Sequence, residues 1–293
     1  MVLAVWKNDV DKVRKCLMGG ANANSRLPSS IKTALMIAAS RGFSEILHIL
    51  LSRGASLNAK DNDGNFAIHL AAEHGHLECV RLLMEKKCLA NVGNSRYHTP
   101  LMLAAAKGHV HIVNHLLDNG VNMAYKLNKH FESELTLAAR FKHLEIVKVL
   151  LRRADAGIDR SAELNEAYSN ALLSSTNEIV ETLLSAGADV NYFEIPNALP
   201  LFTAIGRRDV NLVKTLHRHG VDLTKVDEDG YNALMYAVAI EHFEVVEFFI
   251  SLGFDLNVKS TESNLTAIDI AEFGEDRRIF EILRKAQRES IES

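Results

Sequence analysis

A single apolar phrase returns along this chain at an almost constant spacing. Residues 98–109 read HTPLMLAAAKGH, residues 65–76 read NFAIHLAAEHGH, and residues 32–43 read KTALMIAASRGF. The position held by Leu101 recurs every 33 or 34 residues, at Leu35, Ile68, Leu101, Leu135, Tyr168, Leu201, Leu234 and Ile268. A fixed period of this length predicts short structural units stacked in a row rather than one globular core.

Every copy shows the same internal order of residue types. A short apolar segment with paired alanines comes first and ends at a glycine, as in Gly42, Gly75 and Gly108. Glycine at that point predicts a helix end, because glycine adopts the left-handed conformation without steric cost. The run that follows, such as LEIVKVLLRRAD over 144–155, has the apolar spacing of a second helix. A polar turn such as NAKDNDGN over 58–65 closes the unit.

The repeat divides the whole chain into nine units, which we expect to form one array over residues 1–293. Since 33 residues cannot bury an apolar face alone, stacking of neighbouring units must supply the core. The sixth unit is the weakest copy, so we expect the stack to be least regular around residues 153–175. The predicted units are 1–24, 25–58, 59–91, 92–124, 125–157, 158–191, 192–224, 225–257 and 258–293.

Composition favours an intracellular folded protein. Hydrophobic residues make up 47% of the chain and charged residues 24%, which is ordinary for a soluble domain. No apolar run is long enough to span a membrane. The three cysteines form neither a disulfide framework nor a Cys-x-x-Cys pair. We therefore expect a monomer in the cytoplasm or the nucleus that does not bind membranes.

Several phrases resemble ankyrin repeats. These are TPLMLAA followed by GH in the fourth unit, AIHLAAEHGHLECVRLL in the third, and LLSAGADVN over 183–191. The resemblance covers essentially the whole chain and implies an all-α solenoid of helix-turn-helix units with projecting β-hairpin-like turns. It also implies protein–protein recognition. The phrase FESELTLAA over 131–139 is similar to the arrays of the multiple-ankyrin, single-KH proteins.

The chain departs from the ankyrin pattern at several units. The Thr-Pro pair is intact only at Thr99-Pro100. The Gly-His break becomes Lys142-His143, Arg208-Asp209 and Glu241-His242 in later units.

The histidines invite a search for metal or catalytic sites, since His111 and His115 share a helix face at i, i+4 spacing. However, His76, His109, His143 and His242 recur at one repeat position, which favours a hydrogen bond that ties neighbouring units together. The sequence also has no phosphate-binding Gly-rich loop and no nucleophile elbow. We therefore predict no enzyme, no cofactor and no metal site.

A partner surface follows from the repeat register. In an ankyrin-like stack, turn tips and the ends of the first helices form the concave surface. Bases recur there, Glu73 is the only acid at the helix ends, and the chain as a whole has a net charge of −4. This favours binding of an acidic or extended segment of another protein. The candidate residues are Arg41, His74, Lys107, Arg140, Phe141, Arg207, Ile240, Tyr97 and Tyr231, with Lys107, Arg140, Phe141 and Arg207 as the expected centre.

Three alternatives to this interpretation stay open. Surface positions commonly carry charge with no partner at all. RNA or a nucleotide could stack on Phe141 within a basic groove, although the overall acidity argues against it. The array could also act as a scaffold that only spaces other domains.

One further expectation comes from the resemblance. Asn191, with Val190 before it and Leu183 eight residues earlier, is similar to asparagines of ankyrin repeats that an iron- and 2-oxoglutarate-dependent hydroxylase modifies. Asn58, with Leu57 and Leu50, matches this context less closely. The alternative is structural, because an asparagine side chain at this point can hydrogen-bond the backbone of the turn.

Overall fold

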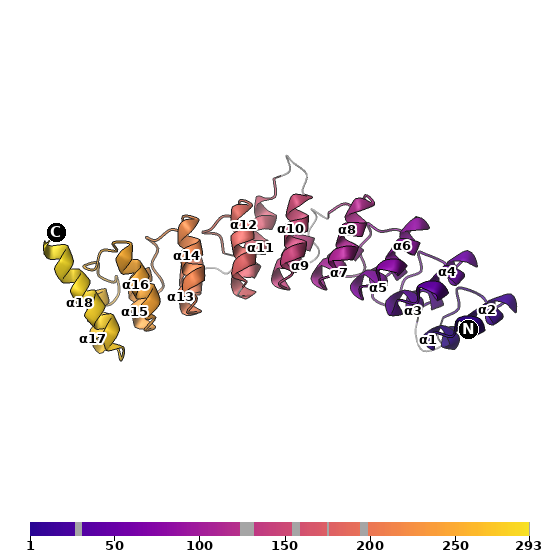
Figure 1. Cartoon of the computed structure of the whole chain (residues 1–293), viewed down its shortest axis with the longest axis horizontal. Coiled ribbons are helices and arrows are strands. Elements are labelled where there is room, and N and C mark those ends of the chain that lie inside the picture. Colours follow the sequence, from indigo (N-terminus) through magenta and orange to yellow (C-terminus); the bar gives the residue numbers. More distant parts are fainter. Residues whose placement is uncertain (27–30, 124–131, 154–158, 175, 194–198, 293) are drawn as a thin grey trace. The chain divides into compact units, whose positions relative to one another are not determined.

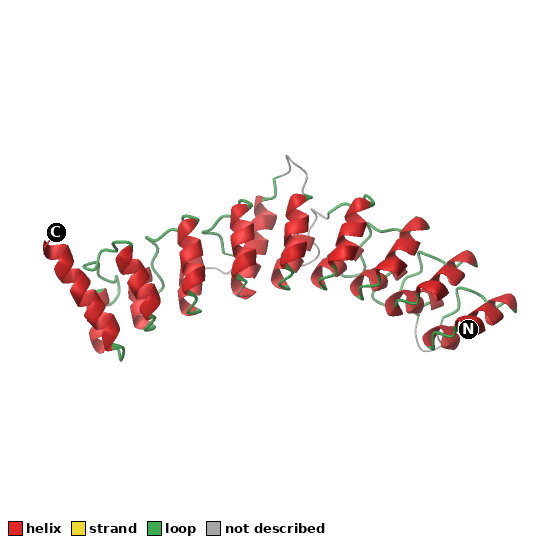
Figure 2. Ribbon diagram, in the orientation of Figure 1, coloured by secondary structure: helices red, strands yellow, loops and turns green. Residues whose placement is uncertain are grey.

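The computed structural model describes residues 1–26, 31–123, 132–153, 159–174, 176–193 and 199–292, without the side chains of 290–292. These residues form two compact bodies, which we call the N-terminal body (Met1–Ile158) and the C-terminal body (Asp159–Ser293). Within the described ranges, helices alternate with loops and there is no strand (Figure 2). The predicted all-α class is confirmed.

The helices of the N-terminal body are α1 (Val2–Trp6), α2 (Val10–Met18), α3 (Ala34–Arg41), α4 (Ser44–Ser52), α5 (Ala67–Glu73), α6 (Leu77–Glu85), α7 (Pro100–Ala106), α8 (Val110–Asp118), α9 (Glu134–Arg140) and α10 (Leu144–Arg152). Those of the C-terminal body are α11 (Ser161–Ser174), α12 (Asn177–Ser185), α13 (Pro200–Gly206), α14 (Val210–Arg218), α15 (Ala233–Ala239), α16 (Phe243–Ser251), α17 (Ala267–Phe273) and α18 (Arg277–Glu292). Odd-numbered helices are the first of each pair, and we call them inner helices.

Side-chain caps fix where the inner helices begin. Thr99 precedes α7, and its hydroxyl accepts a hydrogen bond from Met102 N at 3.1 Å, while Pro100 occupies the first turn. Ser133 caps α9 and Asn232 caps α15 in the same way. Such caps satisfy backbone N–H groups that a helix start leaves without partners. Among the described residues of the turns before these helices, isolated β-bridges join Arg26 with Thr33 and Val226 with Asn232.

The predicted glycine breaks adopt the left-handed conformation. Gly42, Gly75 and Gly108 have φ angles of +73°, +83° and +80°. Where the glycine is replaced, the substituting residue keeps the same backbone, as in Lys142 at +68° and Arg208 at +58°. The break is therefore a requirement of the repeat geometry, and glycine is the residue that meets it at the lowest cost.

The core of the N-terminal body lies between successive inner helices. These helices pack in chain order, α1 on α3, α3 on α5, α5 on α7 and α7 on α9 (Figure 1). The alanine pairs let them approach closely, and all eight of these side chains are 0% exposed: Ala38, Ala39, Ala71, Ala72, Ala104, Ala105, Ala138 and Ala139. The outer helices add Ile46, Leu47 and Leu50, which are also fully buried.

The C-terminal body begins with an irregular pair. Its first helix, α11, has 14 residues, whereas α13, α15 and α17 have 7 each. Tyr168 of α11 is fully buried, and its hydroxyl donates a hydrogen bond to Val190 O at 2.9 Å. Part of the segment expected to be irregular, residues 154–158 and 175, lies outside the described residues. None of the described helices is both long and apolar enough to cross a membrane.

Candidate partner-binding surface

The ends of the inner helices in the N-terminal body share one side of the stack. In each repeat, the two residues before the left-handed break occupy this position. They are Trp6-Lys7, Ser40-Arg41, Glu73-His74, Ala106-Lys107 and Arg140-Phe141. Because the inner helices pack in order, these pairs follow one another along the body.

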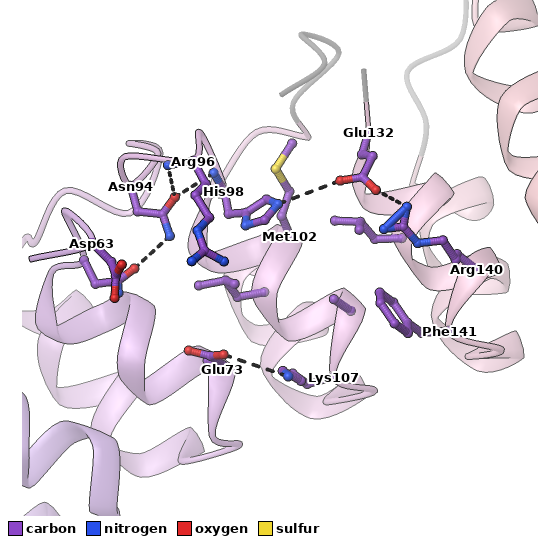
Figure 3. A pocket seen from close by; sticks show the side chains of 14 residues that line it. Asp63, Glu73, Asn94, Arg96, His98, Met102, Lys107, Glu132, Arg140 and Phe141 are labelled. Atoms are coloured by element: carbon purple, nitrogen blue, oxygen red, sulfur yellow. Dashed lines mark hydrogen bonds and ion pairs between the residues drawn. The ribbon is translucent and has the colours of Figure 1, made fainter. Parts of the chain in front are cut away.

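A pocket of about 360 Å³ opens among these helix ends and the neighbouring turns (Figure 3). It brings together three of the predicted residues, Lys107, Arg140 and Phe141. Leu103, Ala106, Leu137 and Met102 supply apolar lining, and Asp63, Asn65, Glu73, Asn94, Arg96, His98 and Glu132 supply polar lining. An apolar hollow with a few polar groups around it is typical of binding sites.

Asn94 shapes the turn that carries two residues of the pocket. Its Oδ1 accepts hydrogen bonds from Arg96 N at 2.9 Å and from His98 N at 3.0 Å. Its amide group donates to Asn65 Oδ1 at 2.8 Å, which joins this turn to the turn before it. The Arg96 side chain extends from this turn into the pocket (Figure 3).

The bases of the pocket are matched by carboxylates. Arg140 forms an ion pair with Glu132, whose side chain is only 8% exposed. His98 Nε2 also lies 3.9 Å from Glu132 Oε2, and Lys107 Nζ lies 3.9 Å from Glu73 Oε1. Asp63 supplies a third carboxylate. The lining is therefore close to charge balance, whereas the sequence analysis counted Glu73 as the only acid at the helix ends.

Sequence reasoning missed Glu132 because it considered only the residues that follow the alanine pairs. Glu132 precedes the N-cap Ser133, and His98 precedes the N-cap Thr99, so the two hold the same repeat position. The residue before each N-cap was the signal that could have revealed them.

Two aromatic side chains are exposed at the described inner-helix ends of the N-terminal body. Phe141 is 48% exposed, and Arg140 Cζ lies 5.3 Å from the centre of its ring. Trp6, which the sequence analysis did not select, is also 48% exposed and carries the Arg41 guanidinium 3.7 Å from its ring centre. Exposed aromatic and arginine side chains are the residue types that most often dominate binding energy at interfaces.

The repeated histidines tie neighbouring units together, as predicted, at three positions. Nε2 of His76, His109 and His143 lies 3.1, 3.0 and 3.1 Å from the backbone oxygens of Ser40, Glu73 and Ala106, respectively. Burial lowers the pKa of His76 below its usual value. His242 differs, since its Nδ1 lies 3.1 Å from Glu244 Oε2 and its buried Nε2 has no partner among the described residues.

Cys79, one of the three cysteines, is buried in the core. Burial raises the pKa of the Cys79 thiol to about 12, so Cys79 is a core residue rather than a nucleophile. In the part of the chain that the structure describes, no three His, Cys, Asp or Glu side chains lie close enough together to hold a metal ion.

Comparison with known proteins decides the family. A family profile described as "Ankyrin repeats (3 copies)" matches residues 1–94, 87–163 and 169–260, which is most of the chain. The chain belongs to the ankyrin-repeat family. The helix pairs, the glycine breaks and the histidine ties described above are the structural form of these repeats in this array.

Several ankyrin-containing relatives match part of the array. The ankyrin repeat and KH domain-containing protein mask-1 of Caenorhabditis elegans is 29% identical over 141 residues, which are 48% of this chain and 5% of that protein. The B-cell lymphoma 3 protein homolog of Mus musculus is 29% identical over 168 residues, which are 55% of this chain and 37% of that protein. The expected likeness to ankyrin proteins with a KH domain is confirmed, and the chain spans only a small part of mask-1.

The remaining predicted residues of the ankyrin array lie outside the pocket. Arg207 and Ile240 belong to the C-terminal body, where the Arg207 guanidinium donates to Leu172 O. The carbonyl of Ile240 accepts from Arg208 at 2.7 Å. Tyr231, also in that body, is half-buried in its turn and donates its N–H to Asp227 Oδ1 at 2.8 Å. Tyr97 is 57% exposed at a turn tip of the N-terminal body.

The turn asparagines of the array bond the backbone of the next unit. Asn191 Oδ1 accepts from Asp222 N at 2.8 Å, and Asn24 Oδ1 accepts from Ser56 N at 2.7 Å. Asn91 Oδ1 accepts from Asn122 N at 3.1 Å, and Asn58 is exposed at the same repeat position. These bonds give the asparagine a structural role in the turn, whether or not it is modified.

Proposed function

We propose that this ankyrin array is a non-catalytic interaction module that binds another protein in the pocket of the N-terminal body. The observation that carries the proposal is the combination of an apolar lining, a half-exposed Phe141 and the Arg96 side chain that extends into the same 360 Å³ space. A single side chain of a partner could fill the apolar part while Arg96 contacts its polar end.

An extended segment with acidic residues is the partner class that we propose. The pocket opens along a row of helix ends, and a chain in extended conformation can follow such a row. Arg140 and Lys107 already face Glu132 and Glu73, so these two bases attract an acidic segment less than unpaired bases would. Among the described residues, the Arg96 guanidinium forms no ion pair or hydrogen bond, which leaves its donors for a partner carboxylate.

The test compares two double variants in pull-downs from cell lysate. Phe141→Ala with Arg96→Ala removes contact groups of the pocket, while the matched control Leu89→Ala with Arg81→Ala changes exposed residues elsewhere on the body. Mass spectrometry and nuclease-sensitive staining then identify bound protein and RNA. A protein that is lost only from the pocket variant supports the proposal. Retention of every bound protein by that variant, or loss of RNA alone, contradicts it.

We propose further that the protein is monomeric, that it acts in the cytoplasm or the nucleus, and that Asn191 and, with a poorer context, Asn58 are hydroxylation sites. The exposure of Asn191 and of Asn58 supports the last proposal, because a modifying enzyme must reach the side chain. Mass spectrometry of the native protein tests it, since hydroxylation adds one oxygen to the peptide that contains the asparagine. Light scattering and cell fractionation test the other two.

A further inference from the structure

Trp6 and Arg41 form a stacked pair on the same surface, in the first two repeats of the array. Trp6 ends α1 and Arg41 ends α3, and the Arg41 Cζ atom lies 3.7 Å from the centre of the indole ring. At this distance the guanidinium lies directly over the face of the ring. Stacking on an aromatic face holds an arginine in place while the N–H groups at the edge of its guanidinium stay free to bind.

Arg41 differs from the other arginines and lysines predicted to bind a partner. Arg140 pairs with Glu132, Lys107 lies near Glu73, and Arg207 donates to Leu172 O. Across the described residues, the Arg41 guanidinium has neither an ion pair nor a hydrogen bond. Its charge and its donors are therefore available to a ligand.

Basic side chains follow Arg41 along the body at one repeat position. Lys7, Arg41, His74 and Lys107 each directly precede the left-handed break of their repeat, and we call them the basic row. His74 donates from Nδ1 to Leu70 O at 2.8 Å, which leaves its Nε2 as the remaining polar atom of the ring. One acid, Glu73, accompanies the row, next to Lys107.

We infer that Trp6 and Arg41 anchor a carboxylate of an extended acidic segment of a partner protein, which then runs along the basic row toward the pocket. This inference rests on the proposed function, because it deepens the chemistry of the same partner. Packed helices are about 9 Å apart, so the row from Lys7 to Lys107 spans about 27 Å. An extended chain rises about 3.3 Å per residue, so about eight residues of the partner cover the row.

Carboxylate chemistry fits this surface better than phosphate chemistry. The guanidinium edge of Arg41 can donate two parallel hydrogen bonds to one carboxylate. The four bases of the row are spread over four repeats and include a histidine, whereas a nucleic-acid site requires a dense patch of lysine and arginine. An acidic segment with a carboxylate at every second or third residue matches this wider spacing of charge.

Trp6 is the only tryptophan of the chain, so its fluorescence reports directly on this anchor. The probe is a synthetic eight-residue peptide of alternating glutamate and serine, titrated at low salt. A fluorescein-labelled copy reports binding anywhere on the protein through anisotropy. We expect the Trp6 emission to change with the same midpoint as the anisotropy, and Arg41→Gln to weaken binding about tenfold.

Controls separate this inference from the proposed function. Arg81→Gln, on the outer helix α6, removes one exposed arginine elsewhere and should leave binding unchanged. Binding that is insensitive to Arg41→Gln, or that leaves Trp6 emission unchanged, overturns the Trp6–Arg41 anchor. If Phe141→Ala with Arg96→Ala still abolishes that binding, the proposed function stands without the anchor.

Two further probes test the ligand chemistry. A peptide with glutamine in place of glutamate should bind at least tenfold more weakly, because it lacks the carboxylates. Equal binding of that peptide overturns the carboxylate assignment. A twelve-nucleotide oligouridine that binds more tightly than the acidic peptide, with the same Trp6 response, also overturns it in favour of nucleic acid.

Discussion

Gly108 and His143 occupy adjoining space in neighbouring repeats. A Cβ atom at Gly108 would lie 2.7 Å from Cε1 of the His143 ring, and Nε2 of that ring lies 3.1 Å from Ala106 O, two residues before the glycine. The absence of a side chain in one repeat therefore makes room for the hydrogen bond of the next. Gly42 with His76 and Gly75 with His109 repeat this relationship.

Gly108→Ala should therefore destabilise the protein more than an alanine at another left-handed glycine. Gly120 is the matched control, because its φ is +78° against +80° for Gly108 and nothing lies within 4 Å of its added Cβ. We expect about 1 kcal/mol of destabilisation for Gly120→Ala from the backbone alone. Gly108→Ala should cost about 1–3 kcal/mol more, because the His143 ring must shift. Equal changes in the free energy of unfolding, measured in urea, would contradict the role of the ring.

His69 should make the protein sensitive to mild acid. The side chain is 0% exposed, its Nδ1 accepts from Phe66 N at 3.2 Å, and burial lowers its pKa to about 4 from 6.5. Because the folded pKa lies below the unfolded value, the neutral form favours folding. This stability is fully present above pH 6.5 and is lost as the pH falls through 4.

His69→Met is the matched variant for this prediction. Met36 and Met102 hold the same helix position in other repeats, and their sulfurs accept from the N-cap N–H at 3.4 and 3.5 Å. Methionine at residue 69 therefore keeps this contact and removes the titrating group. Between pH 7 and pH 4, the native protein should lose about 3 kcal/mol more unfolding free energy than the variant. Parallel pH profiles of the two proteins would rule out His69 as the cause.

The Glu132–Arg140 pair should stabilise the wall of the pocket. Glu132 is 8% exposed, so removing Arg140 leaves a buried carboxylate with His98 at 3.9 Å as a weaker neighbour. We expect Arg140→Gln to cost about 1–3 kcal/mol, at the low end of buried pairs because Arg140 itself is 44% exposed. Glu132→Gln in the same chain should restore part of this loss. A double-mutant cycle with no coupling between the two changes would show that the pair contributes nothing.

The repeat register could be predicted from the sequence because several repeat positions need a particular type of residue for a physical reason. Ala38, Ala71 and Ala104 are small where helices touch, and the glycine breaks need a left-handed backbone. The register therefore predicted the helix pairs, the core and the hydrogen bonds that His76, His109 and His143 make to the preceding repeat.

The ion pairs of the pocket could not be predicted from the register. Glu132 lies before the N-cap of α9 and Arg140 ends that helix, so their contact could not be derived from the repeat spacing. Trp6 was overlooked because its repeat has Ala4-Val5 and Asn8 in place of the alanine pair and the glycine that mark the helix ends of other repeats. The long helix α11 replaced an expected short one because it begins several residues earlier, over 161–166 (SAELNE), where the sequence has no glycine or proline to form the turn that precedes other inner helices.

In the C-terminal body, Arg208 should link neighbouring repeats by hydrogen bonds, as the histidines do in the N-terminal body. It holds the glycine position with φ +58°, and its guanidinium donates to Ile240 O at 2.7 Å and Glu241 O at 3.0 Å, at the end of α15. Arg208→Ala keeps the unfavourable backbone and removes both bonds, so we expect about 1 kcal/mol of destabilisation. Arg208→Gly removes the same bonds but relieves the backbone, and it should be close to neutral.

Lys142 provides the matched control for this last prediction. Its φ is +68°, and no hydrogen bond or ion pair of its side chain occurs within the described ranges. Lys142→Ala should therefore change the free energy of unfolding little, while Lys142→Gly should stabilise the protein by about 1 kcal/mol as the backbone relaxes. Urea denaturation of the four variants measures both differences. If Arg208→Ala were as harmless as Lys142→Ala, the guanidinium bonds would not hold α13 and α15 together, and packing of their apolar faces alone would account for the contact.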